Sequence, residues 1–246
     1  MASSRGQHRS RDLTPATATG PCDDWPMTDD EAAATTAHAG PTDNGPWRRH
    51  SRRTAYENPW VTVWHDEVSR PDGSPGIYGV IHFANLAAGV VVIDEDDRVL
   101  LVGQHRYTLG ETSWEIPEGG VPAGETPLDG MRRELLEETG VEATEWHELG
   151  RLHLSNSVTD EEAFLYLARG LTHGIAQPEP TEQIEVRWVD FEEALAMALD
   201  GRITDALSIV GLQRVALARL GAATTGQATP SSARPSRASG RSREGS

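Results

Sequence analysis

Residue types that often stabilise or anchor a protein are scarce in this chain. Its 246 residues include one cysteine, Cys22, so an internal disulfide is excluded. The longest apolar run, residues 86–93, is far shorter than the roughly 18 residues that a membrane-spanning helix requires. The first residues, MASSRGQHRSRDL, lack the apolar core of a signal peptide. We therefore expect a cytoplasmic protein with no membrane partner.

Lysine is absent. All 22 basic residues are arginines and 38 residues are acidic, which gives a formal net charge of −16. The excess of acid lies in the middle of the chain, where residues 54–220 hold 30 acidic residues and 11 arginines. Such a surface cannot bind nucleic acid by counterion release, so we expect no nucleic-acid partner. It attracts cations, and a metal ion would have to screen it before an anionic substrate could approach.

The two ends of the chain are poor in apolar residues. Residues 1–53 are rich in Ser, Thr, Ala, Gly, Pro and Asp without periodicity, and residues 221–246 contain almost no apolar side chain larger than alanine. This composition predicts disordered tails at 1–53 and 221–246. The remaining residues, 54–220, are enough for a single hydrophobic core.

The most informative stretch is residues 119–141, GGVPAGETPLDGMRRELLEETGV. Thr126 is a good N-cap, Pro127 suits the first helical position, and Gly140 is an expected left-handed stop. An apolar stripe at helical spacing is provided by Leu128, Met131 and Leu135. These signals predict a helix over residues 127–139.

Three glutamates share one face of this predicted helix. Because each helical residue turns about 100°, Glu137 and Glu138 fall within about 60° of Glu134 on either side. Carboxylates this close repel one another unless a cation lies among them, and hard oxygen ligands suit Mg²⁺, with Mn²⁺ as an alternative. A solvated acidic face is the other interpretation. The coincidence of glycine-rich loop, capped helix and acid spacing favours the metal site.

The same stretch resembles the Nudix box, G-x(5)-E-x(7)-R-E-U-x-E-E-x-G-U with U aliphatic. It matches every fixed position of that pattern, namely Gly119, Glu125, Arg133, Glu134, Leu135, Glu137, Glu138, Gly140 and Val141. The resemblance implies a hydrolase of nucleoside diphosphates linked to another moiety. It also implies that Mg²⁺ is held by Glu134, Glu137, Glu138 and the backbone carbonyl of Glu118.

The resemblance further implies that Glu125 and Arg133 form an ion pair that shapes the box. One position departs from the pattern of such helices, because Gly130 stands where alanine is common. A glycine there lowers helix propensity by roughly 1 kcal/mol.

Two segments before the box narrow the resemblance. Gln104, Arg106 and Tyr107, followed by the residues Trp-Glu-Ile-Pro at 114–117, resemble the QxRY and WE-I/L-P segments of ADP-ribose and sugar-nucleotide pyrophosphatases. The resemblance implies that Arg106 and Glu115 of this chain contact the substrate. A guanidinium can hold phosphate oxygens in a fork, but a salt bridge from Arg106 to a nearby acid is an equally good interpretation.

A catalytic acid is expected after the box. The resemblance places it at the end of a polar loop, residues 155–160, that closes on the substrate. Asp160, Glu161 and Glu162 all qualify by type as the group that orients or deprotonates the attacking water, and the alignment with the family's loop favours Glu161. A glutamate of the box, Glu138, is the other candidate base.

The remaining pattern predicts the framework. Strands are expected at 60–68, 77–83, 88–94, 98–104, 145–154, 163–168 and 184–189, and helices at 191–199, after Asp190 as N-cap, and at 204–220. The expected fold class is α/β, a Nudix α/β/α sandwich with a mixed sheet and an N-terminal antiparallel hairpin within residues 54–85. In enzymes similar to ADP-ribose pyrophosphatases such a segment packs across a homodimer, which we expect here; the alternative is an edge hairpin in a monomer.

The sequence therefore predicts metal-dependent hydrolysis of the pyrophosphate bond in ADP-ribose or a related nucleoside diphosphate sugar. Residues 155–157 are Ser-Asn-Ser where ADP-ribose pyrophosphatases usually have Ser-Pro-Gly, so other sugar nucleotides such as GDP-mannose are also credible substrates. The alternative is a Nudix hydrolase of nucleoside triphosphates or dinucleoside polyphosphates, against which the segments before the box argue. A Nudix ligand sensor that regulates transcription is disfavoured, because every box acid is present and no helix-turn-helix pattern follows.

Overall fold

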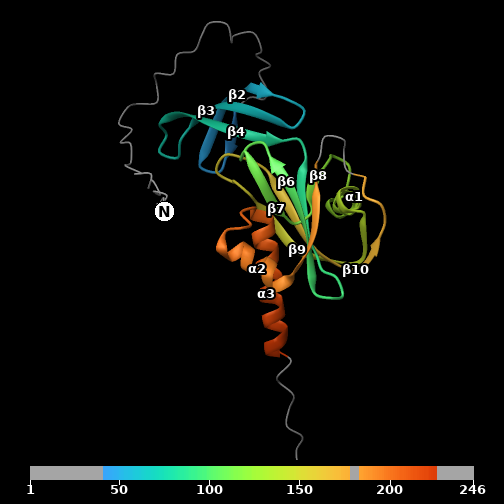
Figure 1. Cartoon of the computed structure of the whole chain (residues 1–246). Coiled ribbons are helices and arrows are strands. Elements are labelled where there is room, and N and C mark those ends of the chain that lie inside the picture. The colour runs from blue at the N-terminus through green and yellow to red at the C-terminus, as the bar shows by residue number, and fades with distance from the viewer. Residues whose placement is uncertain (1–40, 178–182, 226–246) are drawn as a thin grey trace, which may run out of the picture. The chain divides into compact units, whose positions relative to one another are not determined.

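The computed structural model describes residues 41–177 and 183–225, whose strands form three sheets (Figure 1). The N-terminal sheet is antiparallel throughout, with the order β1-β2-β3-β4. Its strands are β1 (Thr42–Asn44), β2 (Trp47–Glu57), β3 (Val61–Ser69) and β4 (Pro75–Phe83). The predicted hairpin is thus present as β3 and β4, within a larger sheet.

The other two sheets form the centre of the domain that contains the box helix. One has the order β8-β5-β10-β9 and is mixed, because β5 and β10 run parallel and the other pairs antiparallel. Its strands are β5 (Leu86–Val92), β8 (Glu118–Val121), β9 (Val141–His153) and β10 (Glu162–His173). The third sheet is antiparallel, with the order β11-β6-β7, and consists of β6 (Arg98–Arg106), β7 (Glu111–Glu115) and β11 (Glu185–Asp190).

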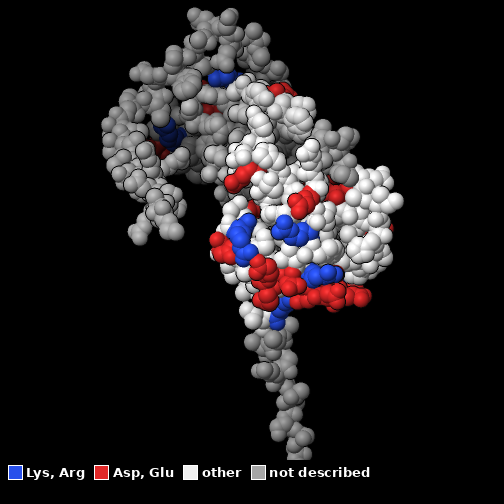
Figure 2. All heavy atoms as spheres, in the orientation of Figure 1, with Lys and Arg blue, Asp and Glu red and all other residues white. Residues whose placement is uncertain are grey.

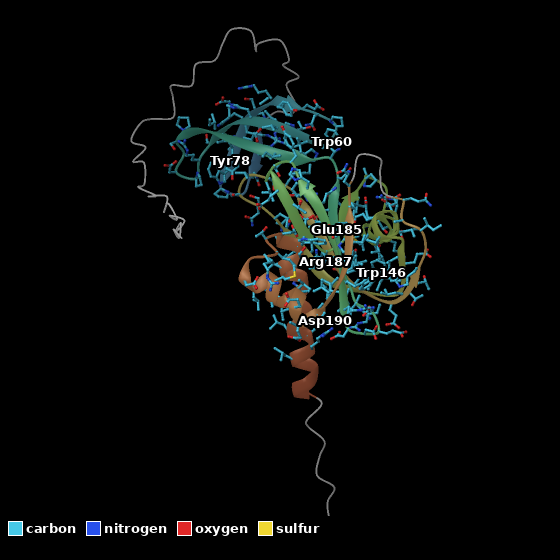
Figure 3. The ribbon with its side chains drawn as sticks, viewed as in Figure 1. Trp60, Tyr78, Trp146, Glu185, Arg187 and Asp190 are labelled. Carbon is cyan, nitrogen blue, oxygen red and sulfur yellow. The ribbon has the colours of Figure 1, made fainter. Side chains whose placement is uncertain are left out.

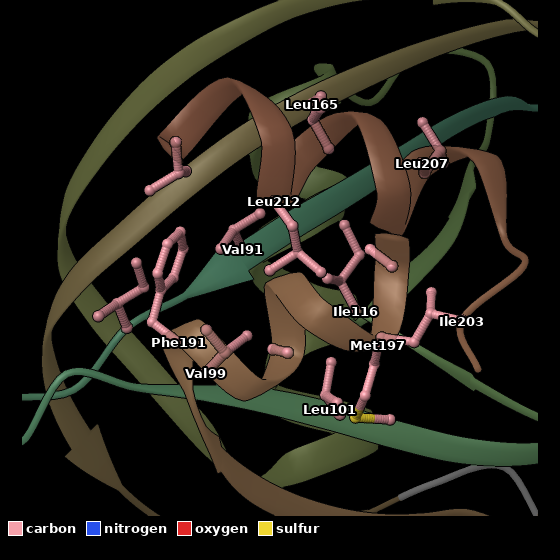
Figure 4. Packing of buried hydrophobic residues seen from close by; sticks show 14 of the residues in the cluster. Val91, Val99, Leu101, Ile116, Leu165, Phe191, Met197, Ile203, Leu207 and Leu212 are labelled. Carbon is pink, nitrogen blue, oxygen red and sulfur yellow. The ribbon is translucent and has the colours of Figure 1, made fainter. Parts of the chain in front are cut away.

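Helices cover both faces of these strands because the strands carry apolar side chains on both faces. Along β5, Val91 belongs to a buried cluster with α2 (Phe191–Asp200) and α3 (Ala206–Thr225). Val90 and Val92 belong to the opposite cluster with α1 (Pro127–Thr139). Figure 4 shows the first cluster, in which Leu101 and Leu165 of the strands pack with Phe191, Met197 and Leu212 of the helices. The predicted α/β/α sandwich is confirmed.

Helix α1 has the predicted bounds and the predicted caps. The Thr126 hydroxyl accepts a hydrogen bond from the Asp129 N–H at 3.2 Å, and Gly140 ends the helix with φ of +70°. An L side chain rarely adopts this backbone conformation, so glycine is required there. The helix that carries the box acids therefore starts and stops where its own sequence dictates.

Asp190 is the N-cap residue of α2, as predicted. Its side chain, however, makes no capping hydrogen bond. The first helical N–H, that of Phe191, donates instead to the carbonyl of Asp97 at 3.0 Å. This donor is thus satisfied by a backbone carbonyl from the turn between β5 and β6. Only the tertiary fold brings that carbonyl to the start of α2.

The predicted boundary between the N-terminal tail and the domain, at residue 54, is wrong. Strands β1 and β2 lie inside the range 1–53 that composition assigned to a disordered tail. Strand β2, WRRHSRRTAYE, has no apolar alternation, and arginine contacts stabilise it instead. Arg52 donates two hydrogen bonds of 2.7 Å to Asp66, and its guanidinium lies 3.9 Å from the centre of the Trp64 ring. The ordered domain therefore begins before residue 54.

The rest of the predicted tails lies mostly outside the described residues, which exclude 1–40, 178–182 and 226–246. Helix α3 runs to Thr225, beyond the predicted boundary at 220. None of the helices in the described part is long and apolar enough to cross a membrane. On the face shown in Figure 2, arginine side chains are interspersed among the acidic ones.

The packing around Gly130 predicts that alanine at this position destabilises the protein, although alanine has the higher helix propensity. A Cβ at this position of α1 would lie 2.7 Å from Val121 Cγ2 and 3.2 Å from Glu125 Oε2. We therefore expect G130A to lower the thermal unfolding temperature, because the overlap outweighs the roughly 1 kcal/mol gained in helix propensity. Gly221, in α3, has open space around its Cα, so G221A is the matched control and should not destabilise the protein. An increase in unfolding temperature for G130A would contradict this view of the packing.

Candidate functional site

Arg133 ties the loop of the box to its helix. Its Nη2 donates to Glu125 Oε2 at 3.0 Å and to the Gly120 carbonyl at 3.0 Å. Its Nη1 donates to Glu134 and Glu137 at 2.9 Å each. The hydrogen bond that Arg133 donates to Glu125 is the main reason why the pKa of Arg133 is raised. The predicted ion pair between Glu125 and Arg133 is confirmed, and Arg133 also orients two of the predicted metal ligands.

Gly119 allows strand β8 to pass close to α1. A Cβ at this position would overlap the carboxyl group of Glu134. The first fixed glycine of the box therefore leaves room for the Glu134 carboxylate in its present position, which a larger residue would displace.

The three box glutamates differ in exposure. Glu138 is buried, with 7% of its surface exposed, whereas the Glu134 and Glu137 side chains are partly exposed. Within the described residues, one group of three acids has ligand atoms that all lie within 4.8 Å of one another, and it consists of Glu115, Glu118 and Asp205. The densest cluster of acids therefore lies beside the box helix and is contributed by β7, β8 and the residue before α3.

Glu118 connects this cluster to the box helix. Its Oε1 accepts a hydrogen bond from Arg106 at 2.9 Å, while its Oε2 is buried with no hydrogen-bond partner in the described structure. Burial raises the pKa of Glu118 well above its usual value, and the nearby Asp205, Glu115 and Glu138 carboxylates raise it further, against the opposing effect of Arg106. One arginine therefore faces several carboxylates at this point.

Arg106 adopts the salt-bridge arrangement. Its Nε donates to both oxygens of Glu115 at 3.0 and 3.1 Å, and its Nη2 donates to Glu115 and to Glu118. Glu115 is buried, and its hydrogen bond is the main reason why the pKa of Arg106 is raised. The structure thus brings the two predicted substrate-binding residues together at the acidic cluster, and their contact with substrate stays a prediction.

Asp205 joins the site through the start of α3. Its Oδ2 accepts a hydrogen bond from the Ser208 N–H at 2.7 Å, and the buried Ser208 hydroxyl accepts one from the Ile116 N–H at 2.8 Å. The helix is thereby docked on the segment between Glu115 and Glu118. Asp205 is not among the predicted site residues, because an Asp directly before a helix is typical of an N-cap. For Glu118, only the backbone carbonyl is a predicted ligand.

This donor set fits a divalent cation. Several carboxylates surround a buried oxygen that lacks a hydrogen bond, and one arginine does not neutralise them all. Hard oxygen donors of this kind suit Mg²⁺ or Mn²⁺, and a cation would relieve the repulsion among them. The buried oxygen belongs to the side chain of Glu118, the residue whose backbone carbonyl was the predicted ligand.

The three acids after the polar loop have different surroundings. Asp160 Oδ2 contacts His82 Nδ1 at 2.7 Å, and its Oδ1 accepts from the Phe83 N–H at 3.2 Å. Glu162 forms an ion pair with Arg151. Glu161 has no hydrogen bond or ion pair within the described structure, and partial burial raises the pKa of its carboxyl. Of the three, Glu161 is therefore the one whose carboxylate is available.

Comparison with known proteins finds two matching families and several similar sequences. Residues 84–207 match the NUDIX domain family, and residues 47–81 match the nucleoside diphosphate sugar hydrolase N-terminal domain. The chain is 32% identical to the ADP-ribose pyrophosphatase of Mycobacterium tuberculosis, over 67% of this chain and 81% of that protein. It is 30% identical to the CMP-5'-(N-acetyl-N-hydroxy-3-aminopropyl)phosphonate hydrolase of Streptomyces rubellomurinus, over 69% of this chain and 82% of that protein.

A solved structure shows the same fold. The crystal structure of an ADP compounds hydrolase superposes with a TM-score of 0.65 and covers 75% of this chain and 96% of its own, at 18% identity. The family match spans the box, the paired segments before it and the start of α3, and the N-terminal match spans the sheet that precedes them. The chain belongs to the Nudix family of hydrolases.

Proposed function

We propose that this Nudix hydrolase cleaves the pyrophosphate bond of ADP-ribose or a related nucleoside diphosphate sugar, giving a nucleoside monophosphate and a sugar phosphate. The observation that carries the proposal is that acidic residues of the box and of the segment before it lie together around Glu118. The box itself is complete. The match of the N-terminal sheet to a nucleoside diphosphate sugar hydrolase domain supports this substrate class. We also propose that the enzyme works in the cytoplasm.

Mg²⁺ is the proposed cofactor, with Mn²⁺ as a substitute, held by Glu134, Glu137, Glu138 and the backbone carbonyl of Glu118. Bound there, the metal would supply charge neutralisation of the diphosphate and a lowered pKa of the attacking water. Glu118, which carries the buried oxygen, lies close enough to Glu138 for the charges of the two carboxylates to interact. This supports a cation bound by both residues. Arg106 limits the repulsion among these acids and keeps Glu115 and Glu118 in place.

Glu161 is the proposed acid that orients the attacking water or takes its proton, with Glu138 as the other candidate. The carboxylates of Asp160 and Glu162 are occupied by His82 and Arg151, whereas that of Glu161 is not. A partly buried carboxyl whose pKa is raised is a better base than an ordinary surface glutamate once it is ionised.

The substrate class can be tested directly with purified protein and Mg²⁺. ADP-ribose, GDP-mannose, UDP-glucose, dinucleoside polyphosphates and nucleoside triphosphates are compared, and the products are identified. We expect cleavage of ADP-ribose or a nucleotide sugar to a nucleoside monophosphate. Cleavage of the triphosphates or the dinucleoside polyphosphates alone would show that the substrate assignment is wrong.

E138Q tests the metal site. We expect the turnover number to fall by on the order of a hundredfold or more, because the substitution removes a charged ligand while keeping the side-chain shape. The matched control is E142Q, which alters an exposed glutamate in β9. If E138Q kept nearly the wild-type rate across a Mg²⁺ titration, the metal assignment would fail.

E161Q and E162Q distinguish the acids at the start of β10. E161Q should depress the turnover number strongly and leave the Michaelis constant and the Mg²⁺ dependence nearly unchanged. E162Q should be mild, because that carboxylate is paired with Arg151. The reverse ranking would move the role to Glu162, and two mild effects would leave Glu138 as the base.

A homodimer through the N-terminal hairpin, residues 60–83, is the proposed assembly. Tyr56, Trp60 and Ile77, in or next to this hairpin, are 57%, 70% and 59% exposed, and Figure 3 marks Trp60. Light scattering should give about twice the 26.7 kDa chain mass. W60E should shift the protein toward the monomer, whereas L199E, which alters an exposed leucine of α2, should not. A wild-type monomer at micromolar concentration would exclude the dimer.

A further inference from the structure

The polar loop before Glu161 is attached to the edge of the N-terminal sheet. The Ile81 N–H donates to the Val158 carbonyl at 2.8 Å, and the Asp160 N–H donates to the Ile81 carbonyl at 3.2 Å. These two bonds form a parallel bridge between Ile81 and Thr159. Strand β4 thus has β3 on one side and this loop on the other.

Side chains of β4 reinforce the backbone attachment. The Tyr78 hydroxyl donates to the Ser157 carbonyl at 2.6 Å, and Tyr78 is marked on this sheet in Figure 3. His82 Nδ1 lies 2.7 Å from Asp160 Oδ2, and the Phe83 N–H donates to the other oxygen of the same carboxylate at 3.2 Å. Because a carboxylate only accepts hydrogen bonds, His82 must carry its proton on Nδ1 in this contact.

The ring of His82 is itself held in place. It stacks on Trp64 with the ring centres 4.7 Å apart and the planes 13° from parallel. Trp64 also contacts the Arg52 guanidinium, which is fixed in turn by two hydrogen bonds to the buried Asp66. Three strands of the N-terminal sheet therefore cooperate to fix the imidazole that meets Asp160.

Glu161 lies between two anchored residues. Asp160 is bound to β4 on one side, and Glu162 is paired with Arg151 of β9 on the other. The backbone of Glu161 is therefore held from both directions while its carboxylate has no partner in the described structure. Such an arrangement holds a reactive group in position while leaving it free to act on substrate. A displacement of about 1 Å at such a group can lower the rate by on the order of a hundredfold.

We propose that His82 is a positioning residue for the Glu161 carboxylate, acting through Asp160, and that the N-terminal sheet therefore sets the geometry of the Nudix site. This inference rests on the proposed catalytic role of Glu161. It gives the sheet a part in the reaction within a single chain, independent of whether the sheet also forms a dimer.

H82A, H82N and H65A test the proposal with Mg²⁺ and ADP-ribose, or with the nucleotide sugar that the wild type cleaves fastest. H82A should lower the turnover number roughly tenfold and change the Michaelis constant by less than about twofold. H82N should recover most of the rate, because the asparagine amide can donate from the place of Nδ1. H65A is the matched control, since His65 lies in the same sheet and pairs with Glu67, and it should keep the wild-type rate.

The same substitutions in an E161Q background separate positioning from general loss of stability. If His82 acts through Glu161, H82A should have almost no further effect on the turnover number of E161Q. An equal loss in both backgrounds, or a wild-type rate for H82A, would overturn the proposal. Nearly wild-type activity of E161Q itself would instead overturn the catalytic role of Glu161, and the positioning role with it.

Y78F provides a second variant in case H82A does not fold. It removes one hydrogen bond to the loop and should lower the turnover number a few-fold, again only when Glu161 is present. Thermal unfolding of each variant identifies losses that come from unfolding. A Y78F effect that persists unchanged in E161Q would contradict the proposal.

Discussion

Several carboxylates are forced together where β8 meets the box helix and the start of α3. Burial of a charged carboxylate is unfavourable unless a positive group compensates it, and here the compensation comes from Arg106 on one side and Arg133 on the other. Neither arginine reaches the buried Oε2 of Glu118. The framework of strands and helices has to be rigid enough to hold these groups against their mutual repulsion.

That rigidity comes from strands with two buried faces. Val90 and Val92 pack toward α1 while Val91 packs toward α2 and α3, so the central strand fixes the positions of both helix layers. The Ser208 hydroxyl then locks the start of α3 to the segment that carries Glu115 and Glu118. Displacement of any one layer would separate acids that come from different elements.

The N-terminal sheet adds a second support. Its contacts to the polar loop run through Tyr78, Ile81 and His82 of one edge strand, and they end at the residue before Glu161. This sheet and the Nudix domain match two different families in sequence, yet hydrogen bonds join the sheet to a loop of the Nudix domain. The metal-binding side and the proton-accepting side of the proposed site are supported by different parts of the fold.

The sequence by itself determined the helix over 127–139, its caps, the Glu125–Arg133 ion pair and the Nudix assignment, because these depend on local spacing within one continuous stretch. It could not reveal strand β2, whose arginines pair with Asp66 and Trp64 across the sheet in place of an apolar pattern. It also could not predict that Asp205 lies near Glu118, or His82 near Asp160, since these residues are far apart in the chain and meet only when the sheets and helices pack. Only the tertiary structure decided which carboxylates are shared, which are paired, and which one is left available.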